Sequence, residues 1–287
     1  MKIAFLTLFV AAAAFSPAIA QTQSPAATQQ GSGSTQSTGG IEAGTVTGTA
    51  WAVTPDGNQV QIQPGQKIPA NAQISTDSGS ALELFFSNGA TVVLQPNTRI
   101  QIPVFTQNPN GVPASGYDKI SREPSSSRLQ IVVVSGSAII DGARLNPLSS
   151  LEARTPVFSA VSQGGVLAVV SDGPNSSIGA ISGGAEVRQL NSLAAPVSLG
   201  VGDRVAANTT ANATGATSTQ VTTSKIPAGE QLALVDLLQN GGVSPAAAPM
   251  DGSGPPALVN PNAGIVVDNS VAGDIPNLSP NGEGQAV

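Results

Sequence analysis

The sequence predicts an all-β fold of short strands joined by tight turns, followed by one short C-terminal helix. Only 10% of the residues are charged and 3% are aromatic, while glycine and proline number 32 and 22. Short runs of alternating apolar residues recur between these turn-forming residues. Small residues, few charges and frequent turns favour short strands with tight connections over long helices.

The first 20 residues have the features of a secretory signal peptide. Lys2 precedes an apolar run from Ile3 to Phe15, and small residues follow at Ala18 and Ala20, where a signal peptidase recognises its site. We therefore expect cleavage between Ala20 and Gln21. The run is too short to span a membrane once cut. The sequence thus predicts a bacterial envelope protein, periplasmic or secreted, that is not membrane-spanning after signal cleavage.

Charge and cysteine content exclude some classes of protein. The chain has 11 basic and 17 acidic side chains, a net charge of −6, and loss of Lys2 with the signal leaves 10 against 17, or −7. Such a chain lacks the basic patch that phosphate backbones require, so no nucleic-acid partner is expected. Because the chain has no cysteine, its fold depends on burial and backbone hydrogen bonds even in an oxidising compartment.

Composition divides the rest of the chain into five segments. Residues 21–40 form a Gln/Ser/Gly/Thr-rich leader that is expected to be disordered, because it holds no aliphatic residue larger than alanine. Residues 41–205 carry the strand pattern and form the predicted β-domain. A Thr/Ala/Asn-rich linker is predicted at 206–225, a short helix at 226–242 and a disordered tail at 243–287.

The stretch "ALELFFSNGATVVL" is the best-defined strand pair of the β-domain. Asn88-Gly89 lies between two apolar runs, and both residues suit the positive φ angles of a tight hairpin. With a period of two, Leu82, Leu84 and Phe86 face one side, and Glu83 and Phe85 face the other. Apolar residues at such positions make up the predicted core: Leu82, Leu84, Val92, Leu94, Ile131, Val133, Val166, Leu167 and Val169.

One segment, "AGEQLALVDLLQNGG", departs from the strand pattern and predicts a helix. Leu232, Val235 and Leu238 recur at i, i+3 and i+6, Leu234 widens this stripe, and Asn240-Gly241 supplies a stop. Isolated helices this short are marginal in water. We therefore expect the helix to fold back over the Thr-rich linker and to cap the C-terminal end of the β-domain. The alternative is a docking segment for a partner.

Two short motifs each occur three times. The first is an aliphatic residue, then Ser or Thr, Gly, a small residue and Ala: Val46-Thr47-Gly48-Thr49-Ala50, Val134-Ser135-Gly136-Ser137-Ala138 and Ile181-Ser182-Gly183-Gly184-Ala185. The second is Gly, one residue, a cation and an aliphatic residue: Gly65-Gln66-Lys67-Ile68, Gly142-Ala143-Arg144-Leu145 and Gly202-Asp203-Arg204-Val205. Glycine is expected to turn, the cation to face water and the aliphatic residue to return inward. The unequal spacing favours successive strand–turn–strand layers with loops of different length.

Several of these features occur together between Gly44 and Ile102: Gly48-x-x-Trp51, Gly65-Gln66-Lys67-Ile68, Ile74-Ser75-Thr76 with Gly79-Ser80, Leu82-x-Leu84-x-Phe86-x-Asn88-Gly89 and Val92-x-Leu94-x-Pro96-Asn97-Thr98-x-Ile100. In this pattern the region resembles the periplasmic FecR-type domain family. Residues 128–170, with "LQIVVVSGSA" and Thr155-Pro156, resemble the second half of that domain. The resemblance covers residues 44–205 and departs from the family at "SAVSQGGVLAV", where an Arg-Gly-Thr is usual.

The resemblance implies a twisted, solenoid-like stack of short strands, and a two-sheet β-sandwich is the alternative. Familiar members of the family regulate sigma factors through a cytoplasmic helical segment and one membrane span. Here a cleavable signal stands in place of the anti-sigma and membrane segments. Regulation of that type is therefore not expected for this chain.

Few side chains suit catalysis. The chain has no histidine and no cysteine, which removes Ser-His-Asp and Cys-His mechanisms and the usual transition-metal ligands. A carboxylate pair for glycoside hydrolysis would draw on Glu83, Asp141, Glu152 or Asp172. However, one tryptophan and one tyrosine offer little for stacking a sugar. We predict no enzyme, no catalytic residue, and no metal or cofactor.

Two further positions have plain structural interpretations. Trp51 alternates with apolar neighbours and is expected in the core. Asp56-Gly57-Asn58 fits a hairpin turn better than a calcium site.

The expected function is a non-enzymatic binding or scaffolding role at the cell envelope, with an unidentified envelope protein or polysaccharide as partner. One alternative is an envelope signalling component that contacts a membrane partner. A second alternative is a carbohydrate-active enzyme.

Overall fold

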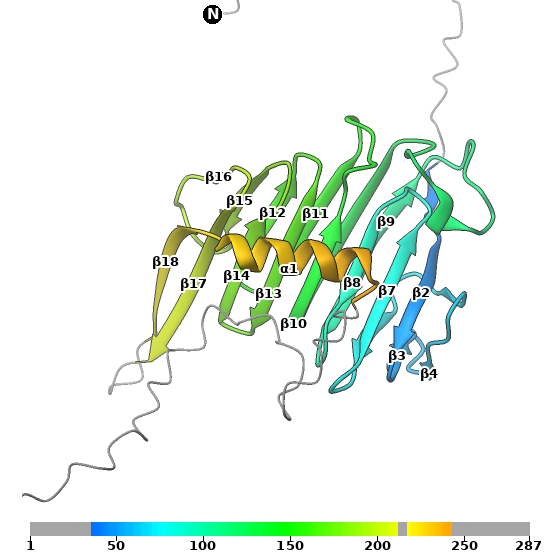
Figure 1. Cartoon of the computed structure of the whole chain (residues 1–287), viewed down its shortest axis with the longest axis horizontal. Coiled ribbons are helices and arrows are strands. Elements are labelled where there is room, and N and C mark those ends of the chain that lie inside the picture. Colours follow the sequence, from blue (N-terminus) through cyan, green and yellow to red (C-terminus); the bar gives the residue numbers. More distant parts are fainter. Residues whose placement is uncertain (1–35, 212–216, 243–287) are drawn as a thin grey trace, which may run out of the picture. The chain divides into compact units, whose positions relative to one another are not determined.

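The computed structural model describes residues 36–211 and 217–242. They form one open, hydrogen-bonded sheet that folds into two facing layers, with a single α-helix lying across the outside of one layer (Figure 1). The predicted all-β fold with a short C-terminal helix is confirmed. The predicted signal peptide, the cleavage site at Ala20 and Gln21, residues 21–35 of the leader and the tail at 243–287 lie outside the described residues.

The front layer is the one that the helix covers in Figure 1. In spatial order its strands are β2 (Ile41–Thr47), β7 (Ala81–Phe86), β8 (Thr91–Leu94), the second half of β10 (Ser127–Asp141), β13 (Val166–Asp172), β14 (Asn175–Ala180), β17 (Asp203–Ala211) and β18 (Thr217–Lys225).

The back layer lies behind it. In spatial order its strands are β4 (Gln59–Gln61), β3 (Ala50–Val53), β6 (Gln73–Thr76), β9 (Arg99–Gln107), the first half of β10, β11 (Ser150–Arg154), β12 (Phe158–Ser162), β15 (Ala185–Gln189) and β16 (Val197–Leu199). Two short strands pair outside this order, β1 (Ser37–Thr38) with β9 and β5 (Lys67–Ile68) with β2. A 3₁₀ turn covers Tyr117–Lys119, and the helix α1 covers Ala228–Gln239.

The long strand β10 belongs to both layers. Its first half pairs with β9 and, in parallel, with β11, whereas its second half pairs with β8 and β13. The fold therefore combines features of the two predicted architectures. As in a solenoid-like stack, the chain passes repeatedly from one layer to the other. As in a β-sandwich, two facing layers enclose one core.

The first repeated motif marks three places where the chain crosses from one layer to the other. Gly48 separates β2 from β3, Gly136 lies within β10, and Gly183 separates β14 from β15. All three glycines have positive φ angles, of 70°, 87° and 68°. A Cβ atom on Gly136 would lie 2.5 Å from the Cα atom of Thr98. The repeat exists because each crossing needs a residue that turns sharply and has no side chain.

The second repeated motif agrees with its prediction only in part. Each of its glycines donates its N–H to a backbone carbonyl of a neighbouring segment, at 2.7 to 2.8 Å. Lys67 is exposed as predicted, and Ile68 and Val205 are buried. Arg204, however, is largely buried and forms an ion pair with Glu230 of α1. The prediction that the cation faces water is wrong there, because α1 packs over that turn.

The main core lies between the two layers and takes in all but one of the predicted core residues. Leu82, Leu84 and Phe86 are fully buried, and Glu83 and Phe85 are not, so the predicted register of β7 is confirmed. The remaining predicted residue, Val166, is also buried, but on the other face of the front layer, under α1.

The hairpin between β7 and β8 differs in one detail from its prediction. Only Gly89 has a positive φ angle, of 85°. Asn88 is instead completely buried, where its side-chain amide donates to the Ser127 hydroxyl at 3.0 Å and its side-chain oxygen accepts from the N–H of Ala90 at 3.0 Å. Asn88 is thus a polar core residue that ties the hairpin to β10.

Helix α1 packs on the outer face of the front layer. Leu234 and Leu237 are buried there against residues that include Val93, Ile139 and Val166. Leu232 is 72% exposed. The predicted helix is confirmed, and Leu234, Val235 and Leu238 of its predicted stripe pack against the sheet. Leu232 does not belong to the packed face, and the predicted position of the helix as an end cap is wrong. The helix covers this face because β8, β10 and β13 present apolar residues on both sides, and all four residues of β8 are buried.

Two predicted boundaries also need correction. Residues 206–225, predicted as a linker, include most of β17 and all of β18. Residues 37 and 38 of the predicted leader form β1. In each case strand pairing with a neighbour overrides weak local preference.

No helix among the described residues is long and apolar enough to cross a membrane.

Candidate binding face

The outer face of the back layer is the candidate site, and the strand period of two decides which residues form it. Ala52, Ile74, Ile100, Ala153 and Val187 point into the core. Their neighbours along each strand therefore point outward. In contrast to the front layer, no described helix covers this face.

Strand register arranges the outward residues in rows across the layer. The longest row crosses eight strands: Gln59, Val53, Gln73, Gln101, Val132, Arg154, Ser159 and Arg188. The next row crosses five strands: Gln130, Glu152, Val161, Glu186 and Ser198. With strands about 4.8 Å apart, the longer row extends over about 34 Å. Such a surface suits an extended partner better than a small molecule.

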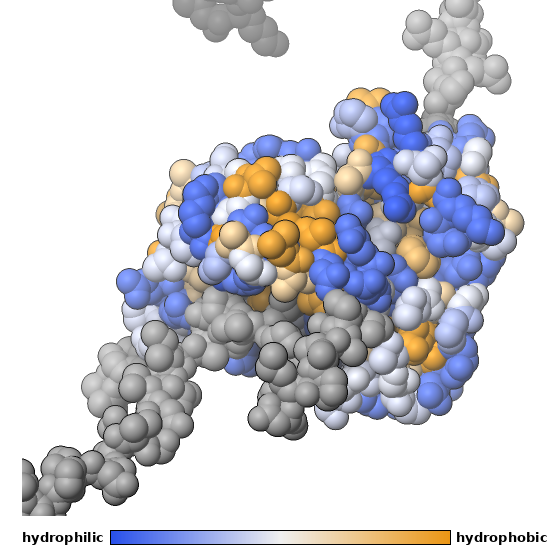
Figure 2. Space-filling model, viewed as in Figure 1, coloured by the Kyte–Doolittle hydropathy of each residue, from blue (hydrophilic) through white to orange (hydrophobic). Residues whose placement is uncertain are grey.

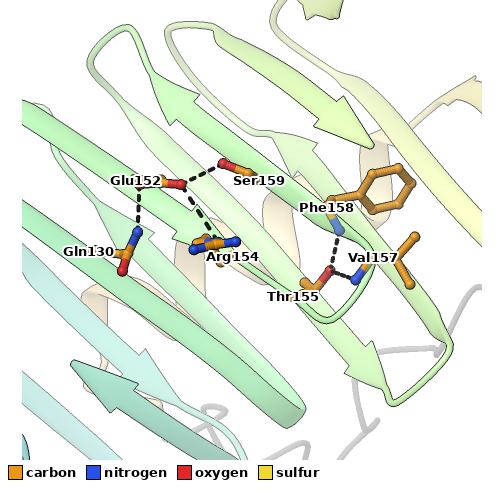
Figure 3. Close-up of polar contacts among 7 residues, drawn as sticks. All are labelled: Gln130, Glu152, Arg154, Thr155, Val157, Phe158 and Ser159. Atoms are coloured by element: carbon orange, nitrogen blue, oxygen red, sulfur yellow. Dashed lines mark hydrogen bonds and ion pairs between the residues drawn. The ribbon is translucent and has the colours of Figure 1, made fainter. Parts of the chain in front are cut away.

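Glu152 is the centre of a hydrogen-bonded cluster on this face (Figure 3). Its carboxylate accepts from the Gln130 amide at 2.6 Å and from the Ser159 hydroxyl at 2.6 Å, and the Arg154 guanidinium lies 3.7 Å away. These four residues come from β10, β11 and β12. Both carboxylate oxygens are occupied, so the cluster holds the side chains of three strands in fixed positions.

The turn that follows this cluster is also fixed by side-chain hydrogen bonds. The Thr155 hydroxyl accepts from the N–H groups of Val157 and Phe158 at 3.2 and 3.0 Å (Figure 3). This arrangement orients β12 next to β11. It explains the Thr155-Pro156 pair as a turn element.

Positive charge collects on the face. Its outward strand positions include four arginines, Arg99, Arg128, Arg154 and Arg188, against two glutamates, Glu152 and Glu186. Four minus two gives +2, on a chain whose net charge is −6. The outward strand positions of this face are therefore more basic than the protein as a whole.

Trp51 also belongs to this face. It is only partly buried, and its indole N–H donates to an Asp77 carboxylate oxygen at 3.2 Å. The prediction that it packs in the core is wrong, since Ala50 and Ala52 take the inward positions of β3. The alternation was visible in the sequence, but which side faced the core was not.

The four carboxylates considered for glycoside hydrolysis are dispersed. Glu152 lies in the back layer, and Glu83 lies on the outer face of the front layer, where it accepts from the N–H of Thr45 at 3.4 Å. Asp141 and Asp172 lie at opposite ends of the pairing between β10 and β13. Glu152 and Glu83 belong to different layers, and Asp172 lies opposite Ser135, six residues along β10 from Asp141, or about 20 Å away. That separation exceeds the roughly 5–9.5 Å between the two carboxyl groups that this chemistry needs.

The Asp56-Gly57-Asn58 segment is a hairpin turn between β3 and β4, as predicted. Thr54 and Asn58 close it through a backbone hydrogen bond of 2.9 Å. The Asp56 carboxylate accepts from the Thr54 hydroxyl and the Asn58 amide, and the Thr54 hydrogen bond lowers the pKa of Asp56. The acid is therefore already engaged within its own turn.

Glu123 is a buried acidic residue that sequence patterns do not reveal. Glu123 is 5% exposed and accepts from the hydroxyls of Ser127 and Ser149, at 2.5 and 2.6 Å, and from the N–H of Asn146 at 2.5 Å. It clamps the loop after β9 to the loop between β10 and β11, beside a groove of about 400 Å³. The Pro/Ser-rich segment around Glu123 gives no sign that this acid is buried, because two of its three partners, Asn146 and Ser149, lie 23 and 26 residues away in the sequence.

Comparisons with known proteins give little beyond this geometry. No family model and no curated protein matches the sequence. Two crystal structures of a candidate anti-sigma factor from Parabacteroides distasonis ATCC 8503 are similar, at 15% identity and with TM-scores of 0.40 and 0.39. Each match covers 57% of this chain and 64% of the other. At this level of similarity, the function has to come from the residues of this chain.

Proposed function

We propose that this chain is an exported, non-enzymatic, FecR-like β-domain that binds an anionic polysaccharide of the cell envelope through the outer face of its back layer. The observation that carries the proposal is the net charge of +2 at the outward strand positions of that face, in a chain of net charge −6. The FecR-type pattern in residues 44–205 and the signal-like first 20 residues support the location at the envelope.

The type of cation on the face supports a carboxylate-bearing ligand. All four cations are arginines, whose planar guanidinium groups bind carboxylates through two parallel hydrogen bonds. Gln73, Gln101 and Ser159 add amide and hydroxyl groups that match sugar hydroxyls in hydrogen bonding. The row that contains them is long enough for a chain of sugars.

The binding test uses polygalacturonate as the anionic probe and dextran as the neutral one. The mature protein should bind polygalacturonate and not dextran in affinity electrophoresis. Arg99→Glu with Arg188→Glu should abolish binding, because both exposed residues lie on the face. Lys119→Glu with Arg122→Glu makes the same change of charge at exposed positions of the loop after β9, and should retain binding.

Two results would overturn the proposal. One is equal loss of binding in both variants, which would indicate that overall charge alone governs retention. The other is no binding to polygalacturonate while an envelope protein is retained, which would favour a protein partner. Thermal melts of both variants check that the fold is kept.

Export has its own test. N-terminal sequencing of the protein recovered from the periplasm or medium should begin at Gln21. An uncut N-terminus on cell-associated protein would contradict this part of the proposal.

The signalling alternative depends on a free helix. Helix α1 instead packs through Leu234 and Leu237 on the front layer, and its Glu230 forms an ion pair with Arg204. The open face of the back layer is therefore the better-supported binding surface.

A further inference from the structure

The strand β18 forms one edge of the front layer. Its nine residues pair in continuous register with β17, from Lys225 opposite Asp203 to Thr217 opposite Ala211. Among the described residues, β17 is its one strand partner, and Figure 1 shows β18 at the opposite end of the layer from β2. Within residues 36–211 and 217–242, one row of its backbone N–H and C=O groups therefore has no strand partner and points away from β17.

The composition of this edge does not block further pairing. The strand reads Thr-Ser-Thr-Gln-Val-Thr-Thr-Ser-Lys, and residues 218–225 are all exposed. It contains no proline, no glycine and no bulge. Its one charge, Lys225, stands at the end of the strand, 2.5 Å from Asp203 on the neighbouring strand. Proteins usually protect long edge strands with charges, prolines or bulges inside the strand.

The sequence of the edge is complementary to itself. In an antiparallel pair centred on Val221, Thr219 faces Thr223, Gln220 faces Thr222, and Ser218 faces Ser224 of the second copy. Cross-strand threonine pairs are favourable in sheets, and like charges placed opposite each other are not. The two Lys225 residues would lie at opposite ends of the pair, about 26 Å apart along the strands, so no like charges meet.

We propose that β18 is a homodimerisation edge, at which two copies of this chain pair antiparallel about a two-fold axis at Val221. The front layers of the two copies then continue as one sheet. The same surface serves both copies, as in other two-fold symmetric dimers. The proposal does not depend on what the back layer binds.

A charge-pairing experiment tests the register. Thr219→Lys with Thr223→Lys places each introduced lysine opposite an introduced lysine of the second copy. Thr219→Lys with Thr223→Glu places lysine opposite glutamate at the same exposed positions. In sedimentation velocity the unmodified chain and the lysine–glutamate variant should be dimers, and the double-lysine variant a monomer. A monomeric unmodified chain, or a dimeric double-lysine variant, would overturn the proposal.

A crosslinking experiment tests the position of the axis. Because the chain has no cysteine, Val221→Cys introduces a single thiol at the proposed axis. Directly opposed residues in antiparallel strands have Cα atoms about 4.5–5.5 Å apart, within disulfide range. An added thiol oxidant should link this variant into covalent dimers. Leu193→Cys, at a fully exposed position away from β18, is the control. Equal crosslinking of the two variants would exclude an axis at Val221.

Discussion

At the scale of single residues, Gly136 shows how close packing at a layer crossing sets the cost of a substitution. Gly57 has nearly the same φ angle, 86° against 87°, but a Cβ atom there would meet nothing within 4 Å. Gly57→Ala should therefore cost only the strain of a positive φ, about 1–2 kcal/mol. Gly136→Ala should cost about 1–3 kcal/mol more, because its Cβ collides with the backbone of Thr98. Urea unfolding of both variants measures the difference, and equal costs would mean that the crossing relaxes.

The register of β7 leads to a second prediction at this scale. Leu84 is completely buried between the layers, whereas Glu83 faces outward. Leu84→Ala should lower the free energy of unfolding by about 2–5 kcal/mol, and Glu83→Ala should change it by less than about 0.5 kcal/mol. Chemical denaturation checks both, and similar small effects would contradict the register.

Asp203 gives the protein a local acid sensitivity. The hydrogen bond from Lys225 and, next, the N–H of Gly200 lower the pKa of Asp203 below 3.8 in the folded state. The unfolded chain then binds a proton before the folded chain does, so this stabilisation is present above pH 3.8 and is lost as pH falls below it. Asp203→Asn should flatten the fall of the unfolding midpoint in that range. Lys225→Met should also flatten this fall, because it removes the hydrogen bond that contributes most to the lowered pKa of Asp203. An unchanged pH profile in Asp203→Asn would contradict this assignment.

At the scale of elements, helix α1 stabilises the front layer through one face. Hydrophobic residues are exposed in the region of α1 on the surface seen in Figure 2. Of the helix leucines, Leu234 is buried against the sheet and Leu232 is exposed. Leu234→Ala should therefore cost about 2–5 kcal/mol, and Leu232→Ala less than about 0.5 kcal/mol. Thermal denaturation of the two variants distinguishes this face from the stripe that sequence periodicity suggests. Equal destabilisation would mean that α1 packs differently.

At the scale of the whole molecule, β10 makes the two layers one cooperative unit. Its first half is a strand of the back layer and its second half is a strand of the front layer. Neither layer therefore keeps its strand pairing if β10 separates. Trp51, the single tryptophan, reports on the back layer, while far-UV circular dichroism reports on all strands. Thermal unfolding followed by the two signals should give the same midpoint. Two separate midpoints would show that the layers unfold independently.

Much of the fold follows from local pattern. Alternation in "ALELFF" and "TVVL" predicts which side chains of β7 and β8 are buried, because a strand has a period of two and one face must meet the core. The repeated motifs predict successive strand–turn–strand layers, and Gly48, Gly136 and Gly183 of the first motif adopt the positive φ angles that favour glycine. The helix is predicted by the change from alternation to helical spacing.

The candidate site could be predicted far less well. The sequence does not show that Arg154 and Arg188 lie in one row, or that Arg99 and Arg128 share their face. That arrangement depends on register between strands distant in sequence. Trp51 was placed on the wrong side because alternation gives two faces without saying which one packs.

The sequence by itself determined the strand pattern of residues 41–205 and the single helix, because these depend on neighbours along the chain. Its composition alone excluded histidine and cysteine chemistry. Only the tertiary structure decided that α1 covers the front layer and leaves the back layer open, and that residues 206–225 pair as strands. These outcomes depend on which apolar faces remain unburied after the layers have met. A face or an edge is a property of the assembled sheet, and no single segment of the chain contains it.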